Sequence, residues 1–151
     1  MGQVLEVIKF NSEHLGMIKA RSFEAKEMTL CDDVQARGRL FQASGPAFTG
    51  VVGDEIMVCC GLIKLWNGVY EMWAVTTAMV TQMPLSFHRA VKYGLEQLRA
   101  VTGLWRLQTA IHIDHVVSQK WIQSLGLEYE APMPGYGPDK ETYIRYGKFY
   151  G

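Results

Sequence analysis

The hydrophobic pattern of the chain predicts strands near its start and in its middle. Residues 4–10 carry several β-branched side chains and end at the polar pair Asn11-Ser12, which is typical of a strand followed by a turn. Three further strands are expected at residues 47–52, 55–65 and 69–77. The short segments Gly53-Asp54 and Asn67-Gly68 between them are typical hairpin turns. The run from Ile56 to Ile63 is apolar at every position, so we expect a central strand covered on both faces.

Apolar residues at helical spacing predict helices between the strands. Two are expected before residue 47, one beginning near Ser12 and one near Asp32-Asp33. The clearest helix begins at Pro84, because Pro is favoured at the first helical position. The last helix is expected to be capped by Asp114, to end at Gly126 and to carry Val117, Trp121 and Leu125 as one apolar stripe. The remaining strands are expected at residues 104–113, 127–130 and 142–149.

The resulting order, β-α-α-β-β-β-α-β-α-β-β, predicts an α/β fold with a mixed, mostly antiparallel sheet flanked by helices. A length of 151 residues predicts a single domain over 1–151. The 15 Lys and Arg balance the 15 Asp and Glu, so we expect no broad nucleic-acid surface. The longest apolar run is too short for a membrane helix, so no membrane partner is expected. The odd number of cysteines, 3, argues against a disulfide framework and favours a cytoplasmic location.

A known family has the same element order. The segment Ser118-Gln119-Lys120-Trp121-Ile122-Gln123-Ser124-Leu125-Gly126-Leu127 also resembles the helix of the GCN5-related N-acetyltransferase (GNAT) fold that ends in Leu-Gly-Phe. The resemblance implies transfer of an acetyl group from acetyl-coenzyme A (acetyl-CoA) to an amine. It also implies that the backbone of Trp73, Ala74, Val75 and Thr76 holds the pantetheine arm, and that Glu71 is the general base.

The family binds the pyrophosphate of its cofactor with a loop of pattern Arg/Gln-x-x-Gly-x-Gly/Ala. Glycines allow close backbone approach, and the following helix end favours an anion. In this chain the loop corresponds to residues 80–85, where Met83 and Leu85 stand in the glycine positions. The resemblance therefore implies a degenerate loop, in which the side chains of Thr81, Gln82 and Ser86 are the available phosphate ligands.

The family's proton donor is also replaced. The tyrosine that commonly protonates the departing thiolate corresponds to Ile122, and the neighbouring asparagine corresponds to His115. An imidazole titrates near neutral pH, so His115 is a second catalytic candidate, as a proton shuttle. The sequence His112-x-Asp114-His115 offers three metal ligands without a fourth, and we expect an exposed turn there and no metal site. Cys59 and Cys60 fall in the covered strand and are expected to be inert core residues.

These departures resemble a narrower group. The run Trp73-Ala74-Val75-Thr76, the missing glycines and the aromatic Trp121 are similar to acetyltransferase-like proteins of short-tailed bacteriophages, which are associated with internal virion proteins. This resemblance implies two alternatives. The protein is an N-acetyltransferase, or it is a catalytically inactive GNAT-fold protein that acts by protein–protein contacts in particle assembly or host takeover. Either alternative implies a location in the bacterial host cytoplasm or in the virion.

Overall fold

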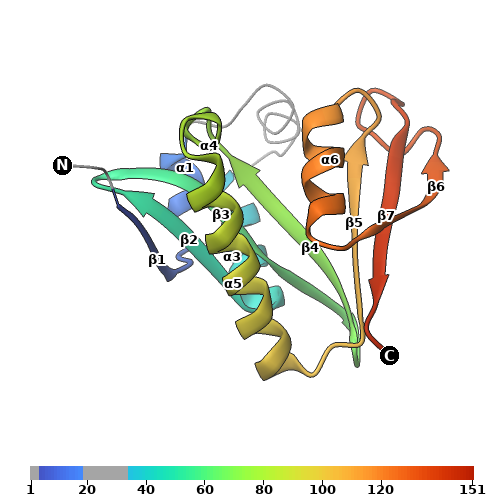
Figure 1. The fold of residues 1–151 in the computed structure, drawn as a ribbon, viewed down its shortest axis with the longest axis horizontal. Helices are drawn as coiled ribbons and strands as arrows, with labels where there is room; N and C mark the ends of the chain where they lie inside the picture. The colour runs from blue at the N-terminus through green and yellow to red at the C-terminus, as the bar shows by residue number, and fades with distance from the viewer. Residues whose placement is uncertain (1–3, 19–33) are drawn as a thin grey trace. The chain divides into compact units, whose positions relative to one another are not determined.

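The computed structural model describes residues 4–18 and 34–151. The elements in these ranges are β1 (Leu5–Lys9), α1 (His14–Met17), α3 (Val34–Ser44), β2 (Ala47–Val52), β3 (Glu55–Trp66), β4 (Val69–Thr76), α4 (Met79–Gln82), α5 (Pro84–Thr102), β5 (Arg106–His112), α6 (Val116–Ser124), β6 (Glu128–Met133) and β7 (Tyr143–Phe149). Within the same ranges, seven strands form one sheet in the order β1-β2-β3-β4-β5-β7-β6 (Figure 1). β4 and β5 are parallel, whereas β1–β2, β2–β3, β5–β7 and β6–β7 are antiparallel. The predicted mixed, mostly antiparallel α/β fold is confirmed.

The chain divides into two compact units. The first comprises Met1–Ile63 and Trp73–Thr102, and the second comprises Lys64–Met72 and Gly103–Gly151. β3 and β4 each contribute residues to both units, because the chain passes between the units within these two strands. The units are described one at a time below.

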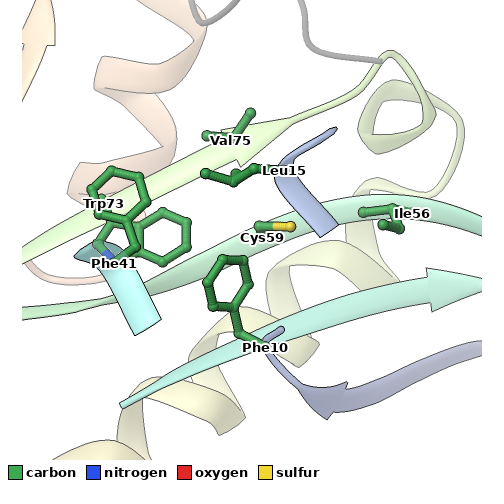
Figure 2. Close-up of a cluster of buried hydrophobic side chains, with 7 residues drawn as sticks. All are labelled: Phe10, Leu15, Phe41, Ile56, Cys59, Trp73 and Val75. Carbon is green, nitrogen blue, oxygen red and sulfur yellow. The ribbon is translucent and has the colours of Figure 1, made fainter. Parts of the chain in front are cut away.

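The first unit has helices on both faces of its strands. On one face, α1 and α3 contribute Leu15 and Phe41 to an apolar cluster, which Figure 2 shows together with Phe10, Ile56, Cys59, Trp73 and Val75. On the other face, α5 packs on β2 at Gly94, where a Cβ would lie 2.6 Å from the ring of Phe48. A side chain larger than hydrogen would therefore push α5 away from the sheet.

β3 is the predicted central strand. Met57, Val58, Cys59, Cys60 and Leu62 are all 0% exposed, so the strand is covered on both faces as expected. The two predicted hairpin turns are also present, since Gly53 and Gly68 have positive φ angles of 60° and 80°. Glycine adopts this backbone conformation without the steric cost that a Cβ would add.

In the second unit, α6 packs on β5 and β7. Leu107, Ile122 and Tyr146 are at most 2% exposed. The hydroxyl of Tyr146 donates to Oε1 of Gln119 at 3.1 Å, and the amide of Gln119 donates to the carbonyl of His112. Gln119 therefore ties the helix to both strands.

The prediction of the last helix is wrong in its cap, and the predicted stripe is covered only in part, since Trp121 and Leu125 are half-buried. α6 begins after its N-cap, His115, rather than at Asp114, and the His115 side chain does not make a capping hydrogen bond to the backbone of the described helix. Val117 is 66% exposed, and Ile122 is the buried residue of the helix. The backbone N–H of Asp114 instead donates to Nδ1 of His112, which places Asp114 in the turn before the helix.

Two other boundaries differ from the sequence expectation. The predicted phosphate loop contains a helical turn, α4. β6 extends to Met133, because a proline at position 132 is tolerated in a strand at the edge of a sheet. The expected start of the second helix at Asp32-Asp33 lies outside the described residues.

No helix of residues 4–18 and 34–151 has the length and apolar character that crossing a membrane requires.

Candidate functional site

The pairing between β4 and β5 ends partway along both strands. Its last pair is Glu71 and Gln108, although β4 continues to Thr76 and β5 to His112. At the next position, the hydroxyl of Thr109 donates to the carbonyl of Met72 at 3.0 Å. A side chain thus replaces the next backbone hydrogen bond of the ladder. The strand segment that the sequence analysis assigned to the pantetheine arm begins immediately after this point.

Backbone direction within this segment follows from the strand geometry. N–H and C=O groups of successive residues point to opposite sides of a strand. Ala74 therefore directs its backbone groups to the same side as the Met72 carbonyl, the side on which the β4–β5 ladder has ended. This arrangement leaves a strand edge that can bind an extended ligand through main-chain hydrogen bonds.

The Trp73 side chain belongs to the core of the first unit. Its ring stacks on Phe41 with centroids 4.1 Å apart and meets Phe10 edge-on at 5.2 Å (Figure 2). Gly61 makes room for the indole, because a Cβ there would lie 2.9 Å from Nε1. The Nε1 atom is buried and has no hydrogen-bond partner among residues 4–18 and 34–151. The indole of Trp73 is therefore part of the core and is not available for ligand contacts.

Backbone amides of the predicted phosphate loop form hydrogen bonds within the same segment of the chain. In and around α4, the N–H groups of Val80, Thr81 and Met83 donate to the carbonyls of Thr77, Ala78 and Met79 respectively. The Met79 N–H donates to the Thr77 hydroxyl. Amides that would have to face a phosphate are thus engaged within the chain, because without glycines the segment forms a helical turn.

The three predicted phosphate ligands remain at the surface. Thr81, Gln82 and Ser86 are exposed. The hydroxyl of Thr81 donates to the carbonyl of Ala78 at 2.7 Å, which leaves its oxygen lone pairs toward solvent. Ser86 lies in the first turn of α5, where backbone N–H groups have no partner within the helix. The segment can therefore bind an anion only through these side chains and the first turn of α5.

The predicted base, Glu71, forms an ion pair. Nη1 of Arg145 on β7 donates to Oε1 of Glu71 at 2.8 Å, and the two side chains are 21% and 25% exposed. The two residues are 74 positions apart in the sequence. Sequence reasoning missed Arg145. A charged residue within the apolar strand Tyr-Ile-Arg-Tyr is a weak signal, and its partner follows only from the strand order.

A second ion pair lies on the same sheet. Arg106 on β5 donates from Nη1 and Nη2 to the two carboxylate oxygens of Glu130 on β6, and from Nε to Gln108 at 3.1 Å. The Glu130 side chain reaches across β7 at Gly147, where a Cβ would lie 2.5 Å from Oε2. This pair lowers the pKa of Glu130, chiefly through the hydrogen bonds from Arg106.

The second catalytic candidate, His115, contacts the helix that follows it. Its Nε2 lies 2.9 Å from the hydroxyl of Ser118, one turn into α6. Nδ1 of His112 accepts from the Asp114 backbone N–H. Among residues 4–18 and 34–151, no three His, Cys, Asp or Glu side chains are grouped to hold a metal ion. His115 and Glu71 both lie in the second unit.

The tyrosine position of the family is buried in this chain. Ile122 is 2% exposed and belongs to the core under α6. Cys59 and Cys60 are also core residues, as predicted, and burial raises the pKa of the Cys59 thiol to about 12. Neither cysteine has the lowered pKa or the exposure of a nucleophile.

Comparison with solved structures identifies the fold. A GNAT-family acetyltransferase from Bacillus anthracis is 12% identical, with a TM-score of 0.72 over 97% of this chain and 95% of that chain. Ard1 from Thermoplasma volcanium is 11% identical, with a TM-score of 0.76 over 96% and 97%. The Salmonella typhimurium protein yncA, solved with its cofactor acetyl-CoA, is 10% identical, with a TM-score of 0.74 over 97% and 94%. No protein-family model and no curated protein sequence matches the chain. These structures show that the chain has the GNAT fold.

Proposed function

We propose that this protein is an N-acetyltransferase in which residues 1–151 act as one domain to move an acetyl group from acetyl-CoA to an amine. The observation that carries the proposal is the end of the β4–β5 ladder at Glu71 and Gln108 within a GNAT fold. A strand edge left by such an opening offers main-chain donors and acceptors to an extended ligand. The acetyl-CoA in the yncA structure provides the model for that ligand.

The two ends of acetyl-CoA fit this chain differently. The pantetheine arm carries amide groups that suit the backbone edge of residues 73–76, where Ala74 faces the open side. The pyrophosphate does not fit in the family's usual way, because the amides around α4 are bonded within the chain. The side chains that would bind the pyrophosphate are those of Thr81, Gln82 and Ser86, which are exposed near the start of α5. The loop is therefore degenerate, and we expect the nucleotide end to add little affinity.

Glu71 would act as the base that accepts a proton from the acceptor amine. Acetyl-CoA supplies the acetyl group as a thioester. Only Oε1 of Glu71 is engaged by Arg145, so Oε2 is available to accept a proton from an amine bound beside it. A base must lie within hydrogen-bond reach of the nitrogen, so we expect the amine to bind beside Oε2 of Glu71. Backbone N–H groups such as that of Ala74 are suited to stabilise developing negative charge on the carbonyl oxygen.

Calorimetric titration with acetyl-CoA and with acetyl-pantetheine tests this proposal. Acetyl-pantetheine keeps the thioester arm and lacks the nucleotide phosphates. We expect both to bind, with Thr81→Ala weakening only acetyl-CoA. Release of free thiol in the presence of an amine panel then measures turnover, and Glu71→Gln should reduce it without abolishing binding. Absence of binding by either compound at millimolar concentration would exclude the enzyme.

A second candidate function rests on the same helical turn. The closed backbone of α4 and the buried Ile122 favour a protein that has lost catalysis and acts through protein–protein contacts. The sequence resemblance to short-tailed bacteriophage proteins implies that such contacts would serve particle assembly or host takeover, in the host cytoplasm or the virion. Cross-linking of the protein in infected cells, followed by identification of the linked phage proteins, tests this alternative. It predicts specific links together with no acetyl-CoA binding.

A further inference from the structure

We propose that the Glu71–Arg145 ion pair is the binding site for the ammonium and carboxylate groups of an α-amino acid. This inference rests on the proposed function, because it assigns the acceptor class of the acetyl transfer. Three observations support the inference: the unused hydrogen-bonding groups of the ion pair, the spacing of the two charges, and the position of Glu71 on β4.

The ion pair is made through one contact only. Oε1 of Glu71 meets Nη1 of Arg145 at 2.8 Å. Oε2 of Glu71 and the Nε and Nη2 groups of Arg145 have no hydrogen-bond partner within the part of the chain that the structure describes. About a quarter of each side chain is exposed, so the pair is in part accessible from solvent. The pair therefore has one acceptor and several donors left for a ligand.

The Arg106–Glu130 pair on the same sheet differs from the Glu71–Arg145 pair in the number of hydrogen bonds that it makes. Arg106 uses both Nη atoms on the two oxygens of Glu130, and its Nε is taken by Gln108. All three guanidinium nitrogens of Arg106 and both carboxylate oxygens of Glu130 are therefore engaged. The difference between the two pairs singles out Arg145 as the guanidinium that can take up a carboxylate in a bidentate manner.

The spacing of the charges selects the ligand. The ammonium and carboxylate of an α-amino acid are attached to one carbon, so they lie about as close together as the two groups of the ion pair. An amino acid can thus place its carboxylate on Nε and Nη2 of Arg145 and its ammonium on Oε2 of Glu71. Both partners are neutral overall, so binding buries no net charge. An amine without the carboxylate would engage only Glu71, and an amino acid with distant charges would have to fold back on itself.

The location of the pair suits acetyl transfer. Glu71 is the last residue of β4 paired with β5, and residues 73–76, the proposed edge for the acetyl donor, follow it directly. The amine would be bound at Oε2 of Glu71, which takes up its proton. The nitrogen then forms a bond to the acetyl carbon while the carbon–sulfur bond breaks and its electron pair goes to sulfur. Overall, an ammonium and a thioester become an amide, a thiol and one proton.

Binding of amino acids without acetyl-CoA tests the inference directly. The probes are L-alanine, L-leucine and L-phenylalanine, each titrated by calorimetry beside the corresponding amine without the carboxylate, with 6-aminohexanoate as the amino acid of distant charges. We expect at least one α-amino acid to bind at least about tenfold more tightly than its amine and than 6-aminohexanoate, because a bidentate charge-assisted contact is lost in each.

Variants separate recognition from folding. Glu71→Gln and Arg145→Gln should each weaken amino-acid binding at least about tenfold, since each removes one recognised charge. The double variant E71Q/R145Q leaves no unpaired charge and should fold like the native protein, as checked by circular dichroism, while binding no better than the single variants. Arg89→Gln and Glu96→Gln, which change exposed charges on α5, are the matched controls and should bind normally.

The outcomes distinguish this inference from the proposed function. Equal binding of an α-amino acid and its amine would overturn the inference, and so would normal binding by Arg145→Gln. Failure of all three amino acids to bind a protein that does bind acetyl-CoA would overturn the acceptor class alone. Charge-dependent amino-acid binding by a protein that does not bind acetyl-CoA would support the site and exclude the transferase.

Discussion

The hydroxyl of Thr109 lies 3.0 Å from the carbonyl oxygen of Met72, one position beyond the last backbone pair of β4 and β5. Thr109 is 8% exposed, so this hydrogen bond is buried. It ends the parallel ladder with a side chain and satisfies a carbonyl that would otherwise lack a partner from β5. The opening of the strands is thus stabilised by a specific contact.

Replacement of Thr109 by Val should destabilise the protein. The variant keeps the shape of the side chain and removes the donor to Met72, which leaves a buried carbonyl without that partner. We expect a loss of about 1–2 kcal/mol in the free energy of unfolding, measured by urea denaturation. Thr109→Ser keeps the hydroxyl and serves as the control. Equal losses in the two variants would show that the methyl group, and not the hydrogen bond, matters.

Replacement of Gly147 by Ala should break the ion pair between Arg106 and Glu130. The new Cβ would lie 2.5 Å from Oε2 of Glu130, so the carboxylate must move away from Arg106. The pair is about a third exposed, and we expect a cost of about 0.5–1 kcal/mol in unfolding experiments. In a Glu130→Ala background, Gly147→Ala should lower the free energy of unfolding only slightly, because no carboxylate then reaches across β7. An equal cost in both backgrounds would contradict this explanation.

Stability should fall in mild acid because of His14. Its Nδ1 accepts from the Asn11 N–H at 3.1 Å and lies 2.7 Å from the Thr49 hydroxyl. Protonation of Nδ1 would break the hydrogen bond from Asn11, whereas the Thr49 oxygen can accept from the new N–H. Burial lowers the pKa of His14 below 6.5, and the Glu13 charge offsets this only in part. The unfolded chain therefore binds more protons between the lowered pKa and 6.5. The free energy of unfolding should be fully retained above about pH 6.5 and should decrease as the pH falls through the lowered pKa.

Urea denaturation over a pH series measures this effect. His14→Asn places an uncharged oxygen acceptor near the position of Nδ1, and it should remove the part of the pH dependence that His14 contributes. A nuclear magnetic resonance titration of the His14 ring should give a midpoint below 6.5. An unchanged pH dependence in His14→Asn would assign the acid sensitivity to other groups.

Cys59 and Cys60 should resist alkylation in the folded protein. Both are 0% exposed, and burial raises the pKa of the Cys59 thiol to about 12, so almost no thiolate is present at pH 8. Iodoacetamide treatment followed by peptide mass spectrometry should find both residues unmodified in buffer and modified in urea. Rapid modification in buffer would show that β3 is reached by solvent.

The order of the elements could be predicted from local patterns, because strands and helices differ in the period of their apolar residues. The covered strand of residues 56–63 and the helix from Pro84 are examples. Two local features were not predictable in the same way. α4 forms because the segment after Thr77 closes its own hydrogen bonds, and α6 buries Ile122 because packing, rather than the stripe through Val117, sets its orientation.

The candidate site shows more clearly which contacts cannot be predicted from the sequence. The sequence by itself determined that Glu71 lies on a strand next to Trp73-Ala74-Val75-Thr76, and that the phosphate loop lacks its glycines. It could not determine that Arg145 faces Glu71, or that Thr109 ends the ladder at Met72. These contacts depend on the sheet order β4-β5-β7-β6, in which β7 lies between strands that precede it in the chain. Hydrogen bonds and ion pairs across a sheet join residues far apart in sequence, so only the tertiary structure decided which charges meet.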